Sequence, residues 1–432
     1  MLQSKTLHSF IYKMQPADFN TEQLSLFADV KSHPWLDSPT VWIVDESSMV
    51  GDKPYEDESE DKDLRFGSGS LLNDLLDCAE IDPVNNLRIL FVGDAGQLPP
   101  IRATEVACPA LDAEALRKQL PVSLQHTSIA EAELTEVKRQ EAGSLLEFVN
   151  DVRRAMETGE FLPRDPRDKV RPLEEGDLVS KYKELTHAGE EPSRAVVLAH
   201  TNHRVTNFNR VIRQALGRDH RLLHRDDVLL VKRNQKVLDF GELEIGFEAT
   251  PLRNGSFVQV IGEPIEDREV SIRIKGQLDP IPLEFWSARI RTIQNEGEKP
   301  REYEVKIFAS RLRLRDRSML QAYEQALFVD LQQRLKTRFN LTPKSPGQDG
   351  YEEYKRRVES DPYFNALRVE YGYAVTVHNS QGGEWPAVIV DPASNKAREW
   401  QNAREHRRSY AKWVYTAITR AQEEVWCLRP GW

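Results

Sequence analysis

The sequence predicts an α/β protein with two parallel-sheet domains and a smaller β-rich part inserted into the second. Short apolar runs recur along the chain, each followed by a polar turn, and helical patterns lie between them. Continuous runs of this length are typical of strands buried on both faces of a parallel sheet. The expected strands are Val41–Val44, Ile89–Val92, Ala195–Ala199, Ala387–Val390 and Val425–Leu428.

The pattern changes in the middle of the chain. Phe247–Val260 and Val270–Ile274 alternate like antiparallel strands, and Asn254-Gly255 is a turn signal. A helical segment, Met319–Arg338, and a Pro/Gly-rich break, Thr342–Gly350, come after them. The expected order is a first α/β domain over 1–143, the first part of a second over 144–221, the insertion over 222–371, and the rest of the second domain over 372–432.

Bulk composition narrows the class of protein. A chain of 432 residues has room for two or three domains. It contains 39% hydrophobic and 30% charged residues, and no apolar run approaches the ~20 residues that span a bilayer. Met1–Thr6 lacks a signal-peptide pattern, and Cys78, Cys108 and Cys427 are widely separated. We therefore expect a cytoplasmic protein without a membrane role, a disulfide framework or a zinc cluster.

The formal net charge of −10 argues against nucleic-acid binding, which depends on lysine and arginine at phosphates. Part of the acidity is local, because Asp52–Asp63 is rich in carboxylates and is expected to be a solvated loop. Basic residues gather elsewhere, in Arg311–Arg317, Lys355–Arg357 and Arg404–Lys412. Each basic run is equally compatible with a solvated helix face and with a nucleic-acid contact.

Two carboxylates at the end of an expected strand are the first chemical signal. Asp45 and Glu46 directly follow Val41–Val44, at the carboxyl end of the expected strand. Open parallel sheets bind ligands at that end of their strands. One carboxylate can hold Mg²⁺ through its waters, and the other can polarise an attacking water. The same pattern also occurs at ordinary surface turns, so both interpretations stay open.

A second expected strand, Leu87–Val92, ends in the string Gly93–Pro100. Gly93 allows a tight exit, Asp94 can order a neighbouring loop, and the uncharged Gln97 can sense a terminal phosphate or its water. The double proline then fixes the outgoing chain. The whole string is far more specific than a Gly-Asp pair.

Together these strings resemble the RecD- and Dda-like helicases of superfamily 1, group B. The resemblance covers nearly the whole chain. The matches are Asp45-Glu46 with motif II, Gly93–Pro99 with motif III, Leu134–Gln140 with motif IV, Thr376–Glu384 with motif V, Tyr415–Ala421 with motif VI, Thr6–Ser9 with motif Ia, and Thr201-Asn202 with a strand-exit pair of the second domain.

The resemblance implies an ATP-dependent DNA helicase that moves 5′ to 3′ along single strands, with ATP and Mg²⁺ as cofactors and single-stranded or junction DNA as partner. It implies two RecA-like domains, the first incomplete at its N-terminus, and an SH3-like barrel beginning at Leu252–Glu263. Catalytic roles fall to Glu46, Gln97, Arg139 and Arg420. Nucleotide contacts fall to Asp45, which also holds Mg²⁺, and to Asp94, Gln140, Gly382 and Glu384. DNA contacts fall to Thr6, His8, Thr201, Asn202, Thr376, His378 and Ser380.

Elementary chemistry agrees with these roles. Phosphoryl transfer depends on positioning and charge neutralisation, so a cleft with carboxylates and Mg²⁺ on one side and arginines on the other suits it. His378 has a second interpretation as a buried hydrogen-bonding residue. Four tryptophans are expected to be core residues and not base-stacking platforms: Trp385, Trp400, Trp413 and Trp426.

One part of the resemblance is missing. Such helicases carry Gly-x-x-x-x-Gly-Lys-Thr/Ser before motif Ia, and this sequence holds no such string. Lys5-Thr6 lacks the glycines, and Gly67–Ser70 is followed by no lysine. Three interpretations follow: a truncated or split helicase, whose phosphate-binding loop a separate polypeptide could supply; a non-catalytic single-strand-binding or accessory protein; and a non-functional remnant.

Overall fold

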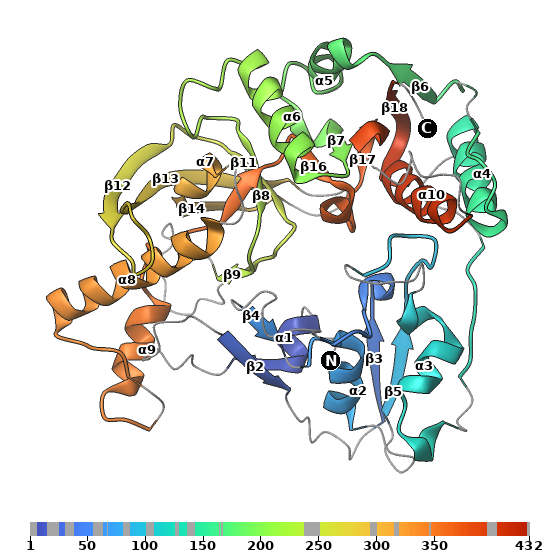
Figure 1. Ribbon diagram of the computed structural model, residues 1–432. Helices are drawn as coiled ribbons and strands as arrows, with labels where there is room; N and C mark the ends of the chain where they lie inside the picture. The colour runs from blue at the N-terminus through green and yellow to red at the C-terminus, as the bar shows by residue number, and fades with distance from the viewer. Residues whose placement is uncertain are drawn as a thin grey trace. The chain divides into compact units, whose positions relative to one another are not determined.

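The computed structural model divides the chain into two compact units (Figure 1). Unit 1 comprises Met1–Val137 and Lys344–Asp349, and unit 2 comprises Lys138–Pro343 and Gly350–Trp432. Each unit is described by itself. The structure describes residues 7–14, 26–30, 39–54, 64–66, 68–80, 87–100, 108–125, 129–135, 143–163, 165, 167–236, 251–293, 300–314, 319–344, 347–394 and 404–429.

Unit 1 contains two small sheets and three α-helices among its described residues. In one sheet β2 (Leu26–Val30) lies between the antiparallel β1 (Tyr12–Met14) and the parallel β4 (Leu64–Phe66). In the other, β3 (Thr40–Val44) and β5 (Leu87–Phe91) are parallel. The helices are α1 (Leu7–Ile11), α2 (Leu71–Ala79) and α3 (Ala113–Gln119).

The β3–β5 pair buries one face only. Val44 belongs to a core cluster built around Leu72 and Leu75 of α2. The opposite face is open: Val41 is 59% exposed and Ile43 65%. On β5, Leu90 is 51% exposed. The expectation of strands buried on both faces is therefore wrong here, because an apolar run does not reveal what covers each face.

Unit 2 is built on a parallel sheet. Its order is β16 (Ala374–Thr376), β7 (Ala195–Ala199), β17 (Trp385–Asp391), β18 (Ala421–Leu428) and β6 (Val170–Leu173). All five residues of β7 are buried, so here the expectation is confirmed. Four helices accompany the sheet (Figure 1): α4 (Ser144–Thr158) packs with α10 (Arg404–Ile418), and α5 (Leu178–Leu185) with α6 (Asn202–Ala215).

An antiparallel sheet interrupts the parallel one in sequence, which confirms the expected α/β class with a β-rich insertion. Its path is β12 (Ile265–Ile272), β13 (Ile281–Ile293), β11 (Phe257–Val260), β8 (Val228–Val231) and β15 (Val369–Tyr371), with β14 (Glu302–Phe308) also paired to β13. A short ribbon, β9 (Gln235–Lys236) and β10 (Pro251–Leu252), adjoins it. Closure into an SH3-like barrel stays a prediction.

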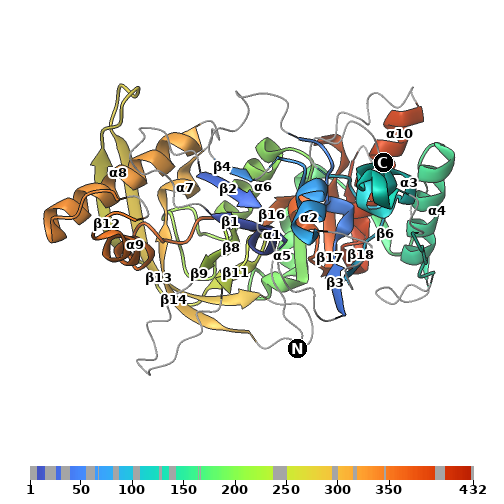
Figure 2. The ribbon, with the colours of Figure 1, turned by 90° about the horizontal axis from the view of Figure 1, so that it is seen from below.

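Three helices accompany this antiparallel sheet, as the turned view shows (Figure 2). They are α7 (Ser310–Arg313), α8 (Leu320–Phe339) and α9 (Tyr351–Glu359). The expected helix Met319–Arg338 is thus confirmed by α8. Ala326 and Leu327 of α8 are fully buried, in a cluster that includes Phe285 of β13.

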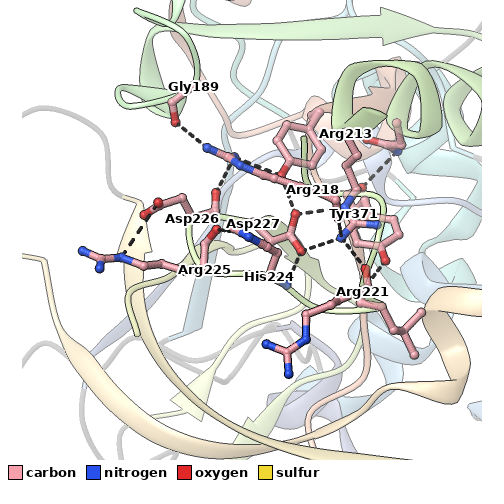
Figure 3. A network of polar contacts seen from close by, with 12 residues as sticks. Gly189, Arg213, Arg218, Arg221, His224, Arg225, Asp226, Asp227 and Tyr371 are labelled. Carbon is pink, nitrogen blue, oxygen red and sulfur yellow. Dashed lines mark hydrogen bonds and ion pairs between the residues drawn. The ribbon is translucent and has the colours of Figure 1, made fainter. Parts of the chain in front are cut away.

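A buried ionic network joins the two sheets of unit 2 (Figure 3). The side chain of Asp227, just before β8, has no exposed surface, and Arg213 of α6 donates two hydrogen bonds to its carboxylate, at 2.9 and 3.0 Å. Tyr373, just before β16, donates its hydroxyl to Asp227 at 2.6 Å, and the backbone N–H of His224 donates at 2.8 Å. These bonds fix α6 and the start of β16 against the start of β8.

The three cysteines, Cys78, Cys108 and Cys427, are all buried. Across the described ranges, no helix combines the length and apolarity needed to cross a bilayer.

Candidate functional site

In unit 1 the ends of β3 and β5 form one edge. The strands pair in register with Val44 opposite Phe91. The N–H of Val92 donates to the Val44 carbonyl at 2.8 Å, and the N–H of Ser47 donates to the Val92 carbonyl at 2.9 Å. Asp45 and Glu46 leave β3 at this edge, and Gly93 and Asp94 leave β5 there. The structure therefore brings together two strings that the sequence singles out separately.

Tight backbone geometry shapes this edge. Glu46 adopts a left-handed conformation with φ of 51°, which a residue with a side chain adopts at a cost of about 1 kcal/mol or more. The carboxylate of Asp45 accepts a hydrogen bond from the Glu46 N–H at 2.9 Å. A Cβ at Gly93 would lie 3.0 Å from the backbone nitrogens of both Ser47 and Ser48. Only glycine fits there without a shift of the backbone.

The loop after β5 positions Gln97. Asp94 accepts hydrogen bonds from the N–H of Gly96, at 2.8 Å to its carboxylate, and from the N–H of Gln97, at 3.0 Å to its carbonyl. Gln97 is 9% exposed, and its Oε1 is buried without a hydrogen-bond donor among the described residues. Because buried acceptors in native proteins almost always have a donor, this atom fits a bound water or ligand.

Asp45 fits the hydrated Mg²⁺ that the resemblance implies. Its side chain is exposed at the end of β3. Within the described part of the chain, no group of three or more His, Cys, Asp or Glu residues could enclose a metal ion. Mg²⁺ at a nucleotide keeps several waters and needs one or two carboxylates, so a single aspartate is compatible with it.

In unit 2 the hydroxyls of Thr376 and Ser380, in the motif V string, form hydrogen bonds within their own turn. Thr376 is 8% exposed, and its Oγ1 accepts from the Asn379 N–H at 3.3 Å, at the start of a 3₁₀ turn over Val377–Ser380. Ser380 is 1% exposed and donates to the Val377 carbonyl at 2.8 Å. A contact from either hydroxyl to DNA would have to replace or share these bonds.

His378 lies in the same turn and is partly buried. Its pKa is lowered, first by burial and then by the neighbouring His200. Burial also lowers the pKa of His200, which follows β7. The lowered pKa favours the neutral imidazole, which can donate and accept hydrogen bonds.

Thr201 and Asn202 follow β7 directly. The Thr201 hydroxyl caps α6 by accepting from the Arg204 N–H at 3.3 Å, and Asn202 is exposed in the first turn. Arg204 forms ion pairs with Asp391 at 2.8 Å and Glu175 at 2.9 Å. Our sequence interpretation missed the Arg204–Asp391 pair, although Asp391 ends an apolar strand just as Asp45 does.

Arg420 is held inside unit 2. It is 1% exposed, and its guanidinium donates to the Thr416 carbonyl at 3.1 Å and the Thr419 hydroxyl at 3.2 Å. A longer bond of 3.4 Å reaches the Gly383 carbonyl. The structure thus places Arg420 beside the Gly382–Glu384 segment, where Gly382 has a left-handed φ of 78°. To act on a phosphate, Arg420 would have to exchange these acceptors for phosphate oxygens.

Some of the remaining candidates lie among the described residues and others do not. His8 is exposed on α1, with its ring 5.7 Å from that of Tyr12. Thr6, Arg139 and Gln140 lie outside the described residues, as do Trp400 and most of the acidic loop. The candidates fall in two units, so their convergence on one nucleotide stays a prediction.

Two of the four tryptophans are core residues, as expected. Trp385 is 5% exposed and Trp413 1%. Trp426 is partly buried, with the Lys181 ammonium 4.2 Å from its ring centroid.

Comparison with known proteins identifies one segment. Residues 371–428 match the sequence profile of the UvrD-like helicase C-terminal domain. The helicase resemblance is confirmed at that level. The matched segment contains β16, β17, α10 and β18, and with them the Thr376–Glu384 and Tyr415–Ala421 strings.

Similar solved structures include two Pif1 helicases. The Pif1 helicase from Candida albicans is 14% identical, with a TM-score of 0.38, over 91% of this chain and 73% of that one. A Pif1 helicase from Bacteroides in complex with ADP-AlF3 and ssDNA is 13% identical, with a TM-score of 0.39, over 92% of this chain and 75% of that one. No curated protein matches the sequence.

Proposed function

We propose that this chain is part of an ATP-dependent DNA helicase that moves 5′ to 3′ along single-stranded DNA. The observation that supports this most is the helicase-domain match over residues 371–428, which encloses both strings that the resemblance assigns to the second domain. The α/β architecture with a parallel sheet in unit 2 agrees with it.

In this proposal the first unit supplies the groups that handle the reacting phosphate. Bound Mg²⁺ would neutralise charge on the nucleotide phosphates. Asp45 holds that ion through its waters, Glu46 accepts a proton from the attacking water, and Gln97 orients that water through its buried carbonyl oxygen. Asp94 orders the loop that carries Gln97. Phosphate contacts fall to Arg139, Gln140 and Arg420, and contacts along the nucleotide to Gly382 and Glu384.

DNA contacts are proposed along the ends of β7 and β16. Asn202 and His378 offer neutral polar groups that bind a strand without reading its bases, which suits movement along any sequence. Thr201, Thr376 and Ser380 shape these turns through their own hydrogen bonds. Thr6 and His8 are the proposed contacts of unit 1.

A second candidate is a protein that binds single-stranded DNA without ATP turnover. The observation that favours it is that the Arg420 guanidinium is engaged by groups of its own unit.

An ATPase assay with a matched pair of variants separates the two candidates. Phosphate release by the purified chain is measured with and without oligothymidylate, for Glu46→Gln and for Glu80→Gln. Both glutamates lie in unit 1 with a left-handed backbone, and Glu80, which follows α2, is exposed. The motor predicts DNA-stimulated turnover, a loss of about 100-fold or more in Glu46→Gln, and no loss in Glu80→Gln.

Other results point elsewhere. Salt-sensitive binding of oligothymidylate without any phosphate release would support the second candidate. Equal turnover by both variants would refute the role of Glu46. If the chain shows neither DNA binding nor ATP turnover, both candidates are overturned.

A further inference from the structure

A short loop after β8 presents basic side chains from a fixed backbone. The loop runs from Lys232 to Asn234. At its start the Lys232 N–H donates to the Arg368 carbonyl at 2.9 Å, and at its end the Asn234 side chain accepts from the Asn254 N–H at 2.7 Å. Arg233 stands between these two anchors with an exposed side chain. The fold therefore sets the position of the Arg233 backbone.

The surroundings of this loop carry more positive than negative charge. Arg311 of α7 and Lys232 face the Glu370 carboxylate at 3.3 and 4.0 Å. Arg368, 2% exposed, forms two hydrogen bonds with Glu324 of α8, at 3.2 and 2.9 Å. We call these six residues the β8 basic cluster: Lys232, Arg233, Arg311, Arg368, Glu324 and Glu370. Four cations and two carboxylates leave two positive charges in excess within the cluster.

Three of the cations act on one carboxylate, that of Glu324. Burial alone would raise the pKa of Glu324, yet the pKa is lowered because Arg368, Arg233 and Arg311 outweigh burial. All three nitrogens of Arg368 donate hydrogen bonds, since Nη1 donates to the carbonyls of Phe364 and Ala366. The pKa of Arg233 is lowered, first by burial and then by the neighbouring Arg368, against the opposite effect of Glu324.

Arg311 has an unused donor. Its Nε is buried without an acceptor among the described residues, and only its terminal nitrogen reaches Glu370. A buried N–H that lacks an acceptor costs about 1–3 kcal/mol, so an anion or water there would be stabilising. The planar fork of arginine suits the oxygens of a phosphate.

The cluster adjoins the motif V turn. The Lys232 ammonium donates to the Asn379 side chain at 3.3 Å, and the Asn379 N–H donates in turn to Thr376. A strand that contacts His378 therefore runs beside Lys232. Phosphates along a single strand repeat at every nucleotide, so a neighbouring phosphate would meet the cluster.

We propose that Lys232, Arg233 and Arg311 form a phosphate-binding site for the backbone of single-stranded DNA. This proposal rests on the proposed DNA-binding function and adds residues that the helicase resemblance does not assign. The contact is sequence-independent, because it involves phosphates and not base edges. The ion pair between Arg368 and Glu324 holds the segment to which the backbone of Lys232 is hydrogen-bonded.

Fluorescence anisotropy of labelled oligothymidylate tests the site. Affinity is measured between about 50 and 200 mM KCl for the wild-type chain, Arg233→Gln and Arg273→Gln. Arg273, just after β12, is also an exposed arginine of unit 2, so both variants lose the same charge. Loss of one phosphate contact lowers the slope of log affinity against log salt by about 0.7, and weakens binding about fivefold near 0.1 M salt.

We expect these losses in Arg233→Gln and not in Arg273→Gln. The double variant Lys232→Gln/Arg233→Gln lowers the slope by about 1.4. Circular dichroism melts of each variant check that the fold is retained.

The outcomes separate this site from the proposed function. If the wild-type chain binds DNA and Arg233→Gln binds with the same slope, the site is refuted while DNA binding stands. If the wild-type chain binds no DNA at about 50 mM salt, both proposals fall. A fluorescent ATP analogue provides a third arm: weaker nucleotide binding with unchanged DNA binding in Arg233→Gln would assign the cluster to nucleotide phosphates and overturn the DNA site.

Discussion

Replacement of Asp227 by asparagine tests the network that joins the two sheets of unit 2. Asparagine has nearly the same shape, so packing is retained while the charge is removed. The Arg213 side chain, 8% exposed, then loses its counter-charge and both of its bonds to a carboxylate. Leaving one member of a buried pair without its partner costs about 3–5 kcal/mol.

The Asp227→Asn variant is therefore expected to lower the free energy of unfolding of unit 2 by about 3–5 kcal/mol. Urea unfolding is followed by tryptophan fluorescence, since Trp385 and Trp413 are buried in this unit. The control is Asp226→Asn. The Asp226 side chain is 42% exposed and 3.9 Å from Arg225, so its loss changes stability by about 0.5 kcal/mol or less.

A loss below about 1 kcal/mol in Asp227→Asn would refute this reasoning. It would mean that the carbonyls of Arg218 and Arg221, which already accept from Arg213 at 2.6 and 3.0 Å, are sufficient partners. A second replacement, Arg213→Met, distinguishes the causes. If the cost comes from an uncompensated buried charge, the double variant is more stable than the sum of the single changes predicts.

Two further predictions concern stability. Gly93→Ala places a Cβ 3.0 Å from the Ser47 nitrogen and is expected to cost about 1–3 kcal/mol in a thermal melt, whereas Gly143→Ala, with nothing within 4 Å, is harmless; equal melts would contradict the close approach. The lowered pKa values of His378 and His200 mean that the unfolded state binds more protons, so stability present above pH 6.5 is lost as the pH falls below that value. Unfolding titrations from about pH 7 to 5 should show this loss, His378→Asn should reduce it, and a pH-independent wild type would contradict the assignment.

Secondary structure was largely predictable from local pattern, while burial was not. The runs that become β3 and β7 have the same apolar character, yet β7 is fully buried and Ile43 of β3 is 65% exposed. The difference lies in what covers each strand, and that depends on residues far away in the sequence. Periodicity predicts which residues share a face, but not whether the face has a partner.

Polar interactions show the same limit. Asp227 meets Tyr373 across 146 positions of sequence, and Arg204 meets Asp391 across 187, so no local pattern signals either pair. The basic run Arg404–Lys412 had two interpretations. In the structure Arg407 and Arg408 donate to the carbonyls of Gly159 and Glu157 at the end of α4, a role that neither interpretation included.

The candidate site was predictable where chemistry follows a strand end. Asp45 and Asp94 reach the same edge because parallel strands end together. The hydroxyls of Thr376 and Ser380 were harder to interpret, because the same side chain can cap a turn or touch a phosphate, and the sequence does not distinguish the two uses.

The open face of β3 and β5 has a practical consequence for anyone who handles unit 1. An exposed apolar stripe on this face consists of Val41, Ile43 and Leu90. Among the described strands, β3 and β5 pair only with each other. Bare strand edges beside such a stripe invite polypeptides to add on, which is how sheets nucleate aggregates. Aggregation of unit 1 should therefore increase steeply with protein concentration. The replacement Ile43→Lys should reduce aggregation at little cost to the core.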